Sequence, residues 1–411
     1  MIVLLAVLQP CATMRLPLGA HRPGGQPWQV NALLCATSSW RVAVAFTGCT
    51  LLLARGILAR RRVLELHRLA QASPVLKASQ LSLPNPDEQR WEAWQAAGAL
   101  LVARLRGSGD SPGWLGCVAP WHVDTLLHER VYQVYLPVFD WLKEMRRLTC
   151  ERGRATLIGM QCLQGGGKTT ICDCLELLAR REGLNCVVAS IDDFYKTHAE
   201  LHALAQAHPD DVLLHGRGQP GTHDMVLLRG TLAQLRALPA GESMCVPRYD
   251  KSAHAGQGDR APRSKWQRVT GPVDLVVLEG WCLGFRSTQQ PRGTGPRCPP
   301  NMRNVDAYLA EFDETYAQLD AFVVVQAICA KYVYAWREQA ERERRVRGEG
   351  AMDAEQVVKF VGRYYPSYEQ YLPQLYVTSP CAEDRTLRYW IDENRRPCQG
   401  GPTGGATAVL Q

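Results

Sequence analysis

A glycine-rich segment at residues 164–170, QGGGKTT, has the composition of a loop that binds the phosphates of a nucleotide. Glycines let backbone N–H groups approach phosphate oxygens, and the start of a following helix adds the positive end of its dipole. Lys168 would reach the β- and γ-phosphates, and the hydroxyl of Thr169 would bind Mg²⁺. Cys162 stands where the usual pattern has its first glycine, so a fortuitous glycine-rich turn is the alternative. The predicted phosphate-binding residues are Gln164, Gly165, Gly166, Gly167, Lys168, Thr169 and Thr170.

Acidic residues follow two short apolar segments. Asp192 and Asp193 come soon after residues 185–190, and Glu279 follows residues 275–278. Ligands bind at the carboxyl ends of strands in open α/β sheets, so these acids would face the same crevice as the glycine-rich loop. One aspartate could take a proton from an acceptor hydroxyl, although both could instead cap a helix. We expect Asp192 to be the base, Asp193 to cap the next turn or bind Mg²⁺ through water, and Glu279 to hold Mg²⁺.

Three basic or mixed segments could bind an anionic substrate or close over it. Residues 217–224 (RGQPGTHD) and 247–252 (PRYDKS) are loop-like and offer cations to an anion. Residues 337–347 contain five arginines, which form either a solvated helix face or a lid that excludes water. The candidates for substrate binding are Asp193, Tyr195, Arg217, His223, Arg248 and Lys251, and the candidates for the lid are Arg337, Arg342 and Arg345.

The hydrophobic pattern predicts the elements that carry these motifs. Residues 155–160 suit a buried strand, residues 169–181 place apolar side chains at helical spacing, and residues 185–190 form another apolar run. Such a βαβ unit implies parallel strands joined by a right-handed crossover. Further buried strands are expected at 273–278 and 321–326. The predicted fold class is therefore α/β, a parallel sheet flanked by helices as in P-loop NTPases.

The rest of the chain divides into further regions. Residues 76–150 are predicted to form a helical addition, because 91–105 and 123–147 have helical composition. Residues 151–395 would form the nucleotide-binding domain with its lid. Residues 396–411 are predicted to be a flexible tail, because glycine and small polar residues dominate them.

Residues 1–70 have the composition of an organelle transit peptide, with no acidic residue before Glu65. A secretory or bipartite signal and a folded or anchoring segment are the alternatives. The uncharged stretch at 42–54 is shorter than the roughly twenty residues that span a membrane, so no membrane partner is expected. We expect the mature protein to begin between about Arg60 and Ser82. Composition does not separate a chloroplast from a mitochondrial destination.

The formal net charge of +7 arises in the N-terminal segment. Residues 1–64 contain seven arginines and no acidic residue, which leaves 40 basic and 40 acidic residues in the remainder. A neutral body gives no support to nucleic-acid binding. The 15 cysteines form no C-x-x-C pair and no zinc spacing, so they indicate buried thiols in a reducing compartment rather than disulfides or a zinc site.

The motifs together resemble the D-glycerate 3-kinase family, a branch of the P-loop kinases that includes uridine kinase, phosphoribulokinase and bacterial pantothenate kinase. The resemblance covers about residues 125–395. The family does not account for residues 1–75 or for the long linker between Gln289 and Arg303. The family also lacks the leading glycine at the position of Cys162. The segments that carry the resemblance are GMQCLQGGGKTT, SIDDFY, RGQPGTHD, VPRYDKSAHAGQGDRAP, VLEGWCLGF, YVYAWREQAE and FVGRYYPSYEQYLPQLY, in this order.

The resemblance implies transfer of the γ-phosphoryl group of ATP to D-glycerate, giving 3-phosphoglycerate, with Mg²⁺ as cofactor. Lys168 would neutralise developing charge and Asp192 would be the base, while Arg217, His223, Arg248 and Lys251 would be candidates for holding glycerate. In photosynthetic organisms such a kinase closes the photorespiratory cycle, which implies the chloroplast stroma, with the mitochondrion or cytoplasm as alternatives. A monomer that binds only small molecules is expected.

Two other functions stay open at this point. One is another small-molecule kinase of the superfamily, which would act on a nucleoside or a sugar phosphate. The other is a regulatory nucleotide-binding switch without a phosphoryl acceptor. The sequence contains no [NT]-K-x-D motif of the kind that reads guanine, which argues against a guanine-nucleotide switch.

Overall fold

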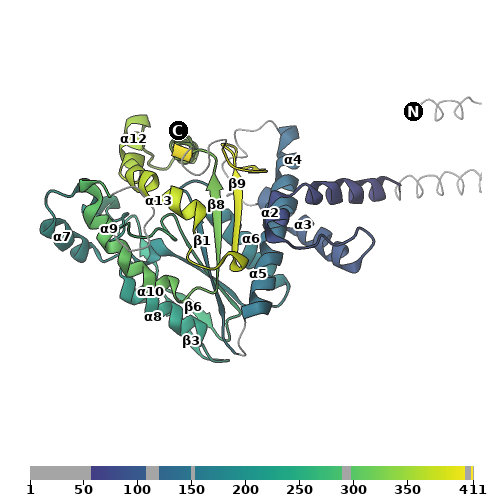
Figure 1. The fold of residues 1–411 in the computed structure, drawn as a ribbon, viewed down its shortest axis with the longest axis horizontal. Helices are drawn as coiled ribbons and strands as arrows, with labels where there is room; N and C mark the ends of the chain where they lie inside the picture. The colour runs from purple at the N-terminus through teal and green to yellow at the C-terminus, as the bar shows by residue number, and fades with distance from the viewer. Residues whose placement is uncertain (1–56, 108–119, 150–152, 289–297, 403–408, 411) are drawn as a thin grey trace, which may run out of the picture. The chain divides into compact units, whose positions relative to one another are not determined.

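The computed structural model describes residues 57–107, 120–149, 153–288, 298–402 and 409–410 (Figure 1). Most of the predicted targeting segment and all of the linker residues 289–297 lie outside these residues. The chain divides into two compact units, Met1–Arg62 and Val63–Gln411. Of the first unit, only the helical residues 57–62 are described.

A six-stranded sheet forms the centre of the second unit. Its strand order is β10-β9-β8-β1-β7-β2, and all neighbouring pairs are parallel except the antiparallel pair of β10 with β9. This arrangement confirms the predicted α/β class. The strands are β1 (Thr156–Cys162), β2 (Cys186–Ser190), β7 (Leu275–Gly280), β8 (Ala321–Ala327), β9 (Thr386–Ile391) and β10 (Pro397–Cys398).

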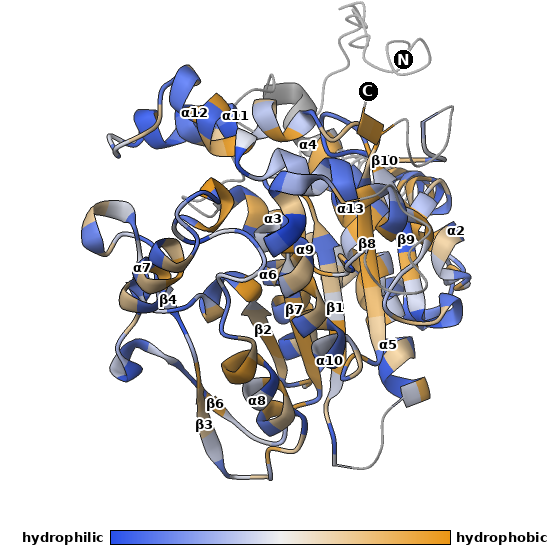
Figure 2. Cartoon of the chain, turned by 60° about the vertical axis from the view of Figure 1, so that its left-hand side comes forward, coloured by the Kyte–Doolittle hydropathy of each residue, from blue (hydrophilic) through white to orange (hydrophobic). Residues whose placement is uncertain are grey.

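Helices cover the sheet on both sides, which explains why the central strands are mostly apolar. Every residue of β1 and β8 is buried. Figure 1 shows α5 (Leu136–Thr149) and α6 (Lys168–Arg181) on the right of the strands, and α8 (Met225–Arg236) and α10 (Asp313–Tyr316) on the left. Strand β8 is accordingly orange over most of its length in the hydropathy view of Figure 2. The helices after β1 are α6 (Lys168–Arg181), α7 (His198–Ala207), α8 (Met225–Arg236), α9 (Arg303–Leu309), α10 (Asp313–Tyr316), α11 (Tyr332–Val346), α12 (Ala354–Gly362) and α13 (Tyr365–Val377).

Two short antiparallel ribbons lie between α8 and β7 in the chain. Strand β3 (Ser243–Val246) pairs with β6 (Gln267–Thr270), and β4 (Tyr249–Asp250) pairs with β5 (Asp259–Arg260). The second ribbon carries the basic segment around Lys251 toward the carboxyl ends of the parallel strands. None of the helices in the described part of the chain is long and apolar enough to span a bilayer.

The N-terminal helices belong to the same unit as the sheet. They are residues 63–71, α2 (Pro74–Ser79), α3 (Gln89–Gly107), α4 (Pro120–Arg130) and α5 (Leu136–Thr149), with a π-helical turn at Val131–Tyr135 between the last two. Helix α2 contacts β9, and α5 contacts β1 and α6. The tryptophans of α3 pack in the core, and Trp94 Nε1 donates a hydrogen bond of 2.8 Å to Asp140.

The first helical residues of this unit contribute to its core. Leu66 and Ala70 are buried, and the buried Ser73 hydroxyl donates a hydrogen bond of 2.6 Å to the carbonyl of Gln133. These residues precede position 76, where the folded chain was predicted to begin. The extent of the targeting segment stays a prediction, but a mature chain that keeps this core must start at its earlier end.

We therefore expect a chain that starts at residue 76 to be much less stable than one that starts at Val63. The shorter chain lacks Leu66, Ala70 and Val75, and burial of a large aliphatic side chain contributes roughly 1.5–3 kcal/mol. Thermal unfolding of the two purified chains measures the difference. Equal melting temperatures would show that these residues add nothing to the fold.

The C-terminal residues differ from the flexible tail expected at 396–411. Strand β10 pairs with β9, and Cys398 lies opposite Trp390. Val409 is buried, and its carbonyl accepts a hydrogen bond of 2.8 Å from the N–H of Ala330. The prediction of a flexible tail followed the glycine-rich composition before this position. It did not account for the apolar pair Val409 and Leu410, which packs against the core.

Candidate active site

The glycine-rich segment forms a loop between β1 and α6. Gly165 and Gly167 have φ angles of 77° and 100°, a region that side chains rarely adopt. A Cβ atom on Gly166 would lie 2.3 Å from the sulfur of Cys162. The thiol therefore fills the space beneath the loop, and burial raises its pKa to about 11, so it is no nucleophile. Lys168 folds back over the loop, with its Nζ donating to the carbonyls of Cys162 at 3.0 Å and Leu163 at 3.3 Å.

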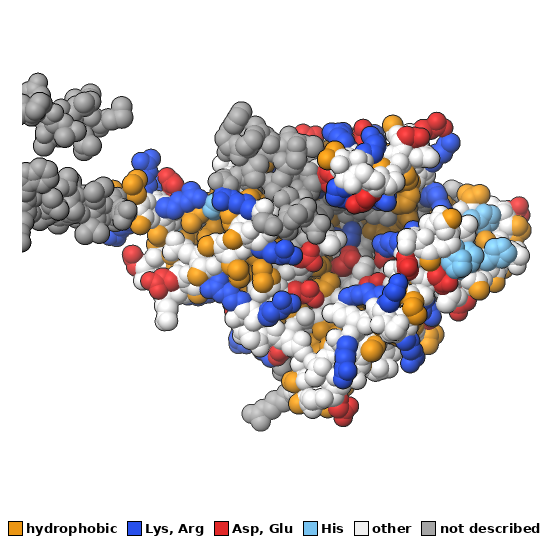
Figure 3. Space-filling model, turned by 180° about the vertical axis from the view of Figure 1, so that it is seen from behind, with side chains coloured by type: hydrophobic (Ala, Val, Ile, Leu, Met, Phe, Trp, Pro, Cys, Tyr) orange, Lys and Arg blue, Asp and Glu red, His pale blue; other side chains and the backbone are white. Residues whose placement is uncertain are grey.

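A cavity of about 1070 Å³ opens between this loop, the carboxyl ends of β2 and β7, and helices α11 and α12. Figure 3 shows the molecule hollowed on this face, with charged side chains around the hollow and histidines gathered beside it. We call this space the reaction cavity. The predicted residues that line it are Gln164, Gly165, Lys168, Thr169, Asp192, Tyr195, Arg217, Lys251, Glu279 and Arg337.

Asp192 lies in this cavity in a short 3₁₀ turn after β2. Its Oδ2 accepts a hydrogen bond from Lys251 at 2.6 Å, and its Oδ1 accepts one from the Tyr195 hydroxyl at 2.9 Å. Burial alone would raise the pKa of Asp192, but Lys251 and Tyr195 outweigh burial and hold the pKa below its usual range. The carboxylate is therefore ionised and open to a ligand in the cavity.

Asp193 points elsewhere and holds the β4–β5 ribbon. It accepts hydrogen bonds from Arg248 at 2.6 Å and from the backbone N–H of Tyr249 at 3.1 Å. Arg248 also donates to Gln267. Burial raises the pKa of Asp193 although Arg248 opposes it. Neither Asp193 nor Arg248 lines the reaction cavity, so the structure does not bring these two predicted substrate residues to it.

His223 is also absent from the cavity lining. Its side chain is buried and stacks on the ring of Tyr195 with centroids 4.5 Å apart. Neither ring nitrogen has a hydrogen-bond partner in the described part of the chain, and burial lowers its pKa to about 4. The imidazole is therefore neutral and packs against the ring of Tyr195. The structure does not bring His223 to the cavity, where it was predicted to contact substrate.

Glu279 is the penultimate residue of β7 and lines the cavity, as Thr169 does. Its Oε2 is buried without a hydrogen-bond partner among the described residues. Burial raises the pKa of Glu279, and the attraction of Lys168 opposes this rise. A buried carboxylate oxygen with a free lone pair and a hydroxyl that line one cavity are oxygen donors of the kind Mg²⁺ prefers, so these residues fit the predicted ion.

Only some of the arginines of the predicted lid, residues 337–347, line the cavity. Arg337 lines it, forms an ion pair with the buried Glu341, and lies 4.4 Å over the ring of Phe360. Arg344 also lines the cavity, although it was not among the predicted residues. Arg342 pairs with Glu338 on the same helix, Arg345 donates to the carbonyl of Met352, and neither lines the cavity. The remaining predicted residues outside the lining are Gly166, Gly167 and Thr170.

Sequence reasoning missed a contact between the C-terminal segment and the phosphate loop. Arg395 Nε donates a hydrogen bond of 2.6 Å to the carbonyl of Gly165, and its guanidinium lies 5.1 Å over the ring of Trp336. Its Nη1 donates to Gln339 at 3.0 Å. Arg395 thereby joins the loop to helix α11. No local motif marks this residue, because its partners lie far away in the sequence.

We expect an Arg395→Gln variant to bind ATP about tenfold more weakly, because hydrogen bonds made by charged groups contribute roughly 1.5–3 kcal/mol. The KM for ATP measures the change. The matched control is Arg396→Gln, since Arg396 is an exposed neighbour that pairs with Glu129 at 3.5 Å. Equal ATP affinity in both variants would contradict a role of Arg395 in holding the loop.

Comparison with known proteins gives relatives in plants and fungi. A chloroplastic D-glycerate 3-kinase of Arabidopsis thaliana is 38% identical over 279 residues, which are 65% of this chain and 60% of that protein. An uncharacterized kinase, mug58, of Schizosaccharomyces pombe is 32% identical over 62% of this chain and 95% of its own length. A probable ATP-dependent kinase, TDA10, of Saccharomyces cerevisiae is 36% identical over 56% of this chain and 83% of its own length. No family model matches.

Solved structures of similar proteins also include a D-glycerate 3-kinase. A D-glycerate 3-kinase from Cryptococcus neoformans matches with a TM-score of 0.56 and 28% identity, covering 64% of this chain and 97% of that one. The structure of the YGR205w protein matches with a TM-score of 0.55 and 32% identity, covering 64% of this chain and 95% of that one. Together with the phosphate loop on a parallel sheet, these matches show that the chain belongs to the D-glycerate 3-kinase family of P-loop kinases.

Proposed function

We propose that this chain transfers the γ-phosphoryl group of ATP to the 3-hydroxyl of D-glycerate. One observation carries the proposal. A single cavity brings together the phosphate loop, an ionised aspartate and two cations, Arg217 and Lys251, that a small carboxylate substrate requires. The D-glycerate 3-kinases among the relatives support the choice of acceptor.

The phosphate loop would hold the triphosphate through its backbone N–H groups and through Lys168. A cation at this position stabilises the charge that builds up on the phosphoryl oxygens as the group moves. Thr169 and Glu279 would hold Mg²⁺, which neutralises phosphate charge when it is bound. Arg337 and Arg344 would approach the phosphates from the α11 side of the reaction cavity and add further positive charge.

Asp192 would act as the general base. Its carboxylate takes the proton of the acceptor hydroxyl, the hydroxyl oxygen forms a bond to the γ-phosphorus, and the bond to the β–γ bridging oxygen breaks to release ADP. Tyr195 and Lys251 hold this carboxylate in place. Arg217 and Lys251 would bind the glycerate carboxylate, because both are cations that line the reaction cavity.

The acid limb of the rate profile should report the pKa of Asp192. Lys251 holds this pKa down, so the base stays ionised until the pH falls below the usual carboxyl range. In a Lys251→Met variant, burial acts without that opposition and the pKa rises, so kcat/KM should begin to fall at a higher pH. The control is Lys265→Met, an exposed lysine outside the cavity lining. An unchanged acid limb in Lys251→Met would exclude Asp192 as the titrating base.

The product identifies the reaction. The full chain is incubated with Mg²⁺, ATP and D-glycerate, and the products are analysed by phosphorus NMR and mass spectrometry. We expect ADP and 3-phosphoglycerate in equal amounts. Formation of 2-phosphoglycerate would contradict the proposed hydroxyl, and ADP with inorganic phosphate alone would contradict the proposed acceptor.

The proposed compartment is the chloroplast stroma, where the chain would act as a monomer in photorespiration. The support is the acid-free, arginine-containing composition of residues 1–64 and the chloroplastic relative. Residues 1–62 fused to a fluorescent protein should direct it to chloroplasts in plant cells. Mitochondrial or cytoplasmic fluorescence would refute the assignment.

A further inference from the structure

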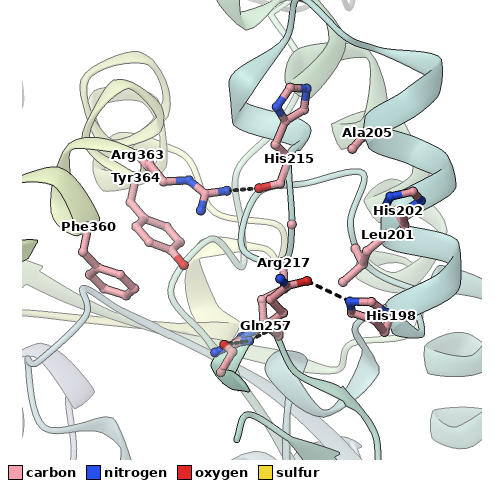
Figure 4. Close-up of a pocket in the computed structure, with 12 residues that line it drawn as sticks. His198, Leu201, His202, Ala205, His215, Arg217, Gln257, Phe360, Arg363 and Tyr364 are labelled. Atoms are coloured by element: carbon pink, nitrogen blue, oxygen red, sulfur yellow. Dashed lines mark hydrogen bonds between the residues drawn. The ribbon is translucent and has the colours of Figure 1, made fainter. Parts of the chain in front are cut away.

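A second cavity of about 480 Å³ lies beside the reaction cavity, between α7, the loop at 215–217 and the end of α12 (Figure 4). We call it the side cavity. Arg217, Gly256, Phe360 and Tyr364 line both cavities. The residues that line only the side cavity are His198, Leu201, His202, Ala205, His215, Gly216, Gln257 and Arg363.

Two guanidinium groups of the side cavity donate hydrogen bonds only to backbone carbonyls and form no ion pair among the described residues, and Arg217 also lies 6.0 Å over the ring of Tyr249. Arg217 donates to the carbonyls of Gly256, at 2.8 Å, and Gln257. Arg363 donates to the carbonyl of His215, as the dashed line in Figure 4 marks. Carbonyl oxygens fix the direction of these side chains but do not neutralise them. Both positive charges therefore remain available to an anion.

Three imidazoles complete the polar wall. His198 Nε2 lies 2.8 Å from Oε1 of Gln257, and His215 Nε2 lies 3.0 Å from the carbonyl of His208. His202 is exposed on α7. The carboxylate near this wall, Asp259, is already engaged by the N–H of His198 at 3.0 Å and by His254 at 3.1 Å. No Asp or Glu occurs among the described residues that line the side cavity.

Apolar side chains lie among these polar groups. Leu201 and Ala205 come from α7, as His198 and His202 do, and Phe360 comes from α12. They offer contacts for a short carbon skeleton, and the cavity has the volume of a typical small-molecule site. Arginine forks bind both carboxylate and phosphate groups, and two separate arginines favour a ligand with two anionic groups.

We propose that the side cavity binds a small phosphorylated carboxylic acid, at the same time as nucleotide and acceptor occupy the reaction cavity. The proposal rests on the proposed function in one respect, since 3-phosphoglycerate, the expected product, belongs to this class. Arg217 lines both cavities, so the two occupants would share the cation that would hold the acceptor carboxylate. Binding there should lower the affinity for D-glycerate.

The test is calorimetric titration of 3-phosphoglycerate into the full chain, with the reaction cavity saturated by Mg²⁺, a non-hydrolysable ATP analogue and D-glycerate. Wild-type protein should bind one equivalent under these conditions. Arg363→Gln, which changes a residue that lines the side cavity alone, should weaken this binding about tenfold or more, in line with the loss of one charge-assisted contact. The control is Arg342→Gln, an equal change of charge at an arginine of α11 that lines neither cavity.

A second variant guards against a folding defect in Arg363→Gln. His202→Gln changes an exposed side chain of α7 and should also weaken binding while the melting temperature stays unchanged. The proposal is wrong if the saturated wild type binds no 3-phosphoglycerate, or if both variants bind it as well as the Arg342→Gln control does. The titration decides this independently of turnover, so a failure to phosphorylate glycerate would refute the proposed function without refuting the side cavity.

Discussion

A Lys168→Ala variant is expected to fold normally and to lose turnover. Lys168 is the first residue of α6 and lines the reaction cavity, with its Nζ within hydrogen-bond distance of two carbonyls of the phosphate loop. Loss of a cation beside a transferring phosphoryl group removes several kcal/mol of transition-state stabilisation, so kcat should fall by about 10²-fold or more.

The measurement is steady-state turnover together with thermal unfolding. A suitable control is Lys359→Ala, which removes an exposed lysine of α12 that pairs with Glu355 at 2.9 Å. The control should keep full activity. Near-normal turnover in a folded Lys168→Ala protein would contradict the assignment of the loop as the phosphate site.

Asp192→Asn is expected to lower kcat by about 10²–10⁴-fold, the usual contribution of a positioned base. Asparagine keeps the shape of the side chain but cannot take the acceptor proton at neutral pH. ATP affinity should change little. Asp193→Asn serves as the matched variant one residue away, and it should act mainly on stability, because Asp193 holds Arg248 and the N–H of Tyr249 rather than facing the cavity.

The two variants are compared at saturating Mg²⁺, which removes any difference in metal affinity. A larger loss of kcat in Asp193→Asn than in Asp192→Asn would reverse the roles of the two carboxylates. Equal turnover of Asp192→Asn and the wild type would mean that another group accepts the proton.

Local patterns predicted the parts of the site that lie at strand ends. The phosphate loop follows directly from the order strand, glycines, helix, and Asp192 and Glu279 follow apolar runs that became β2 and β7. Because the strands are parallel, their carboxyl ends meet at one edge of the sheet. The positions of Asp192 and Glu279 at this edge could therefore be predicted from the sequence.

Burial and long-range contacts could not be predicted in the same way. Arg217 and His223 lie in one short loop, but the first lines the cavity and the second is buried behind Tyr195. Arg395 reaches the phosphate loop across 230 residues, and Val409 packs against the core from a glycine-rich tail. Each of these placements depends on how elements far apart in the sequence pack together. Such packing cannot be predicted from composition or from residue spacing along the chain.

The central claim is that D-glycerate is the phosphoryl acceptor. A coupled assay of ADP release tests it with a panel of acceptors, namely D-glycerate, uridine, ribulose 5-phosphate and pantothenate, with a reaction that lacks any acceptor as control. We expect rapid, saturable ADP release with D-glycerate and only background rates with the others. Preference for another acceptor, or ADP release that no acceptor accelerates, would contradict it.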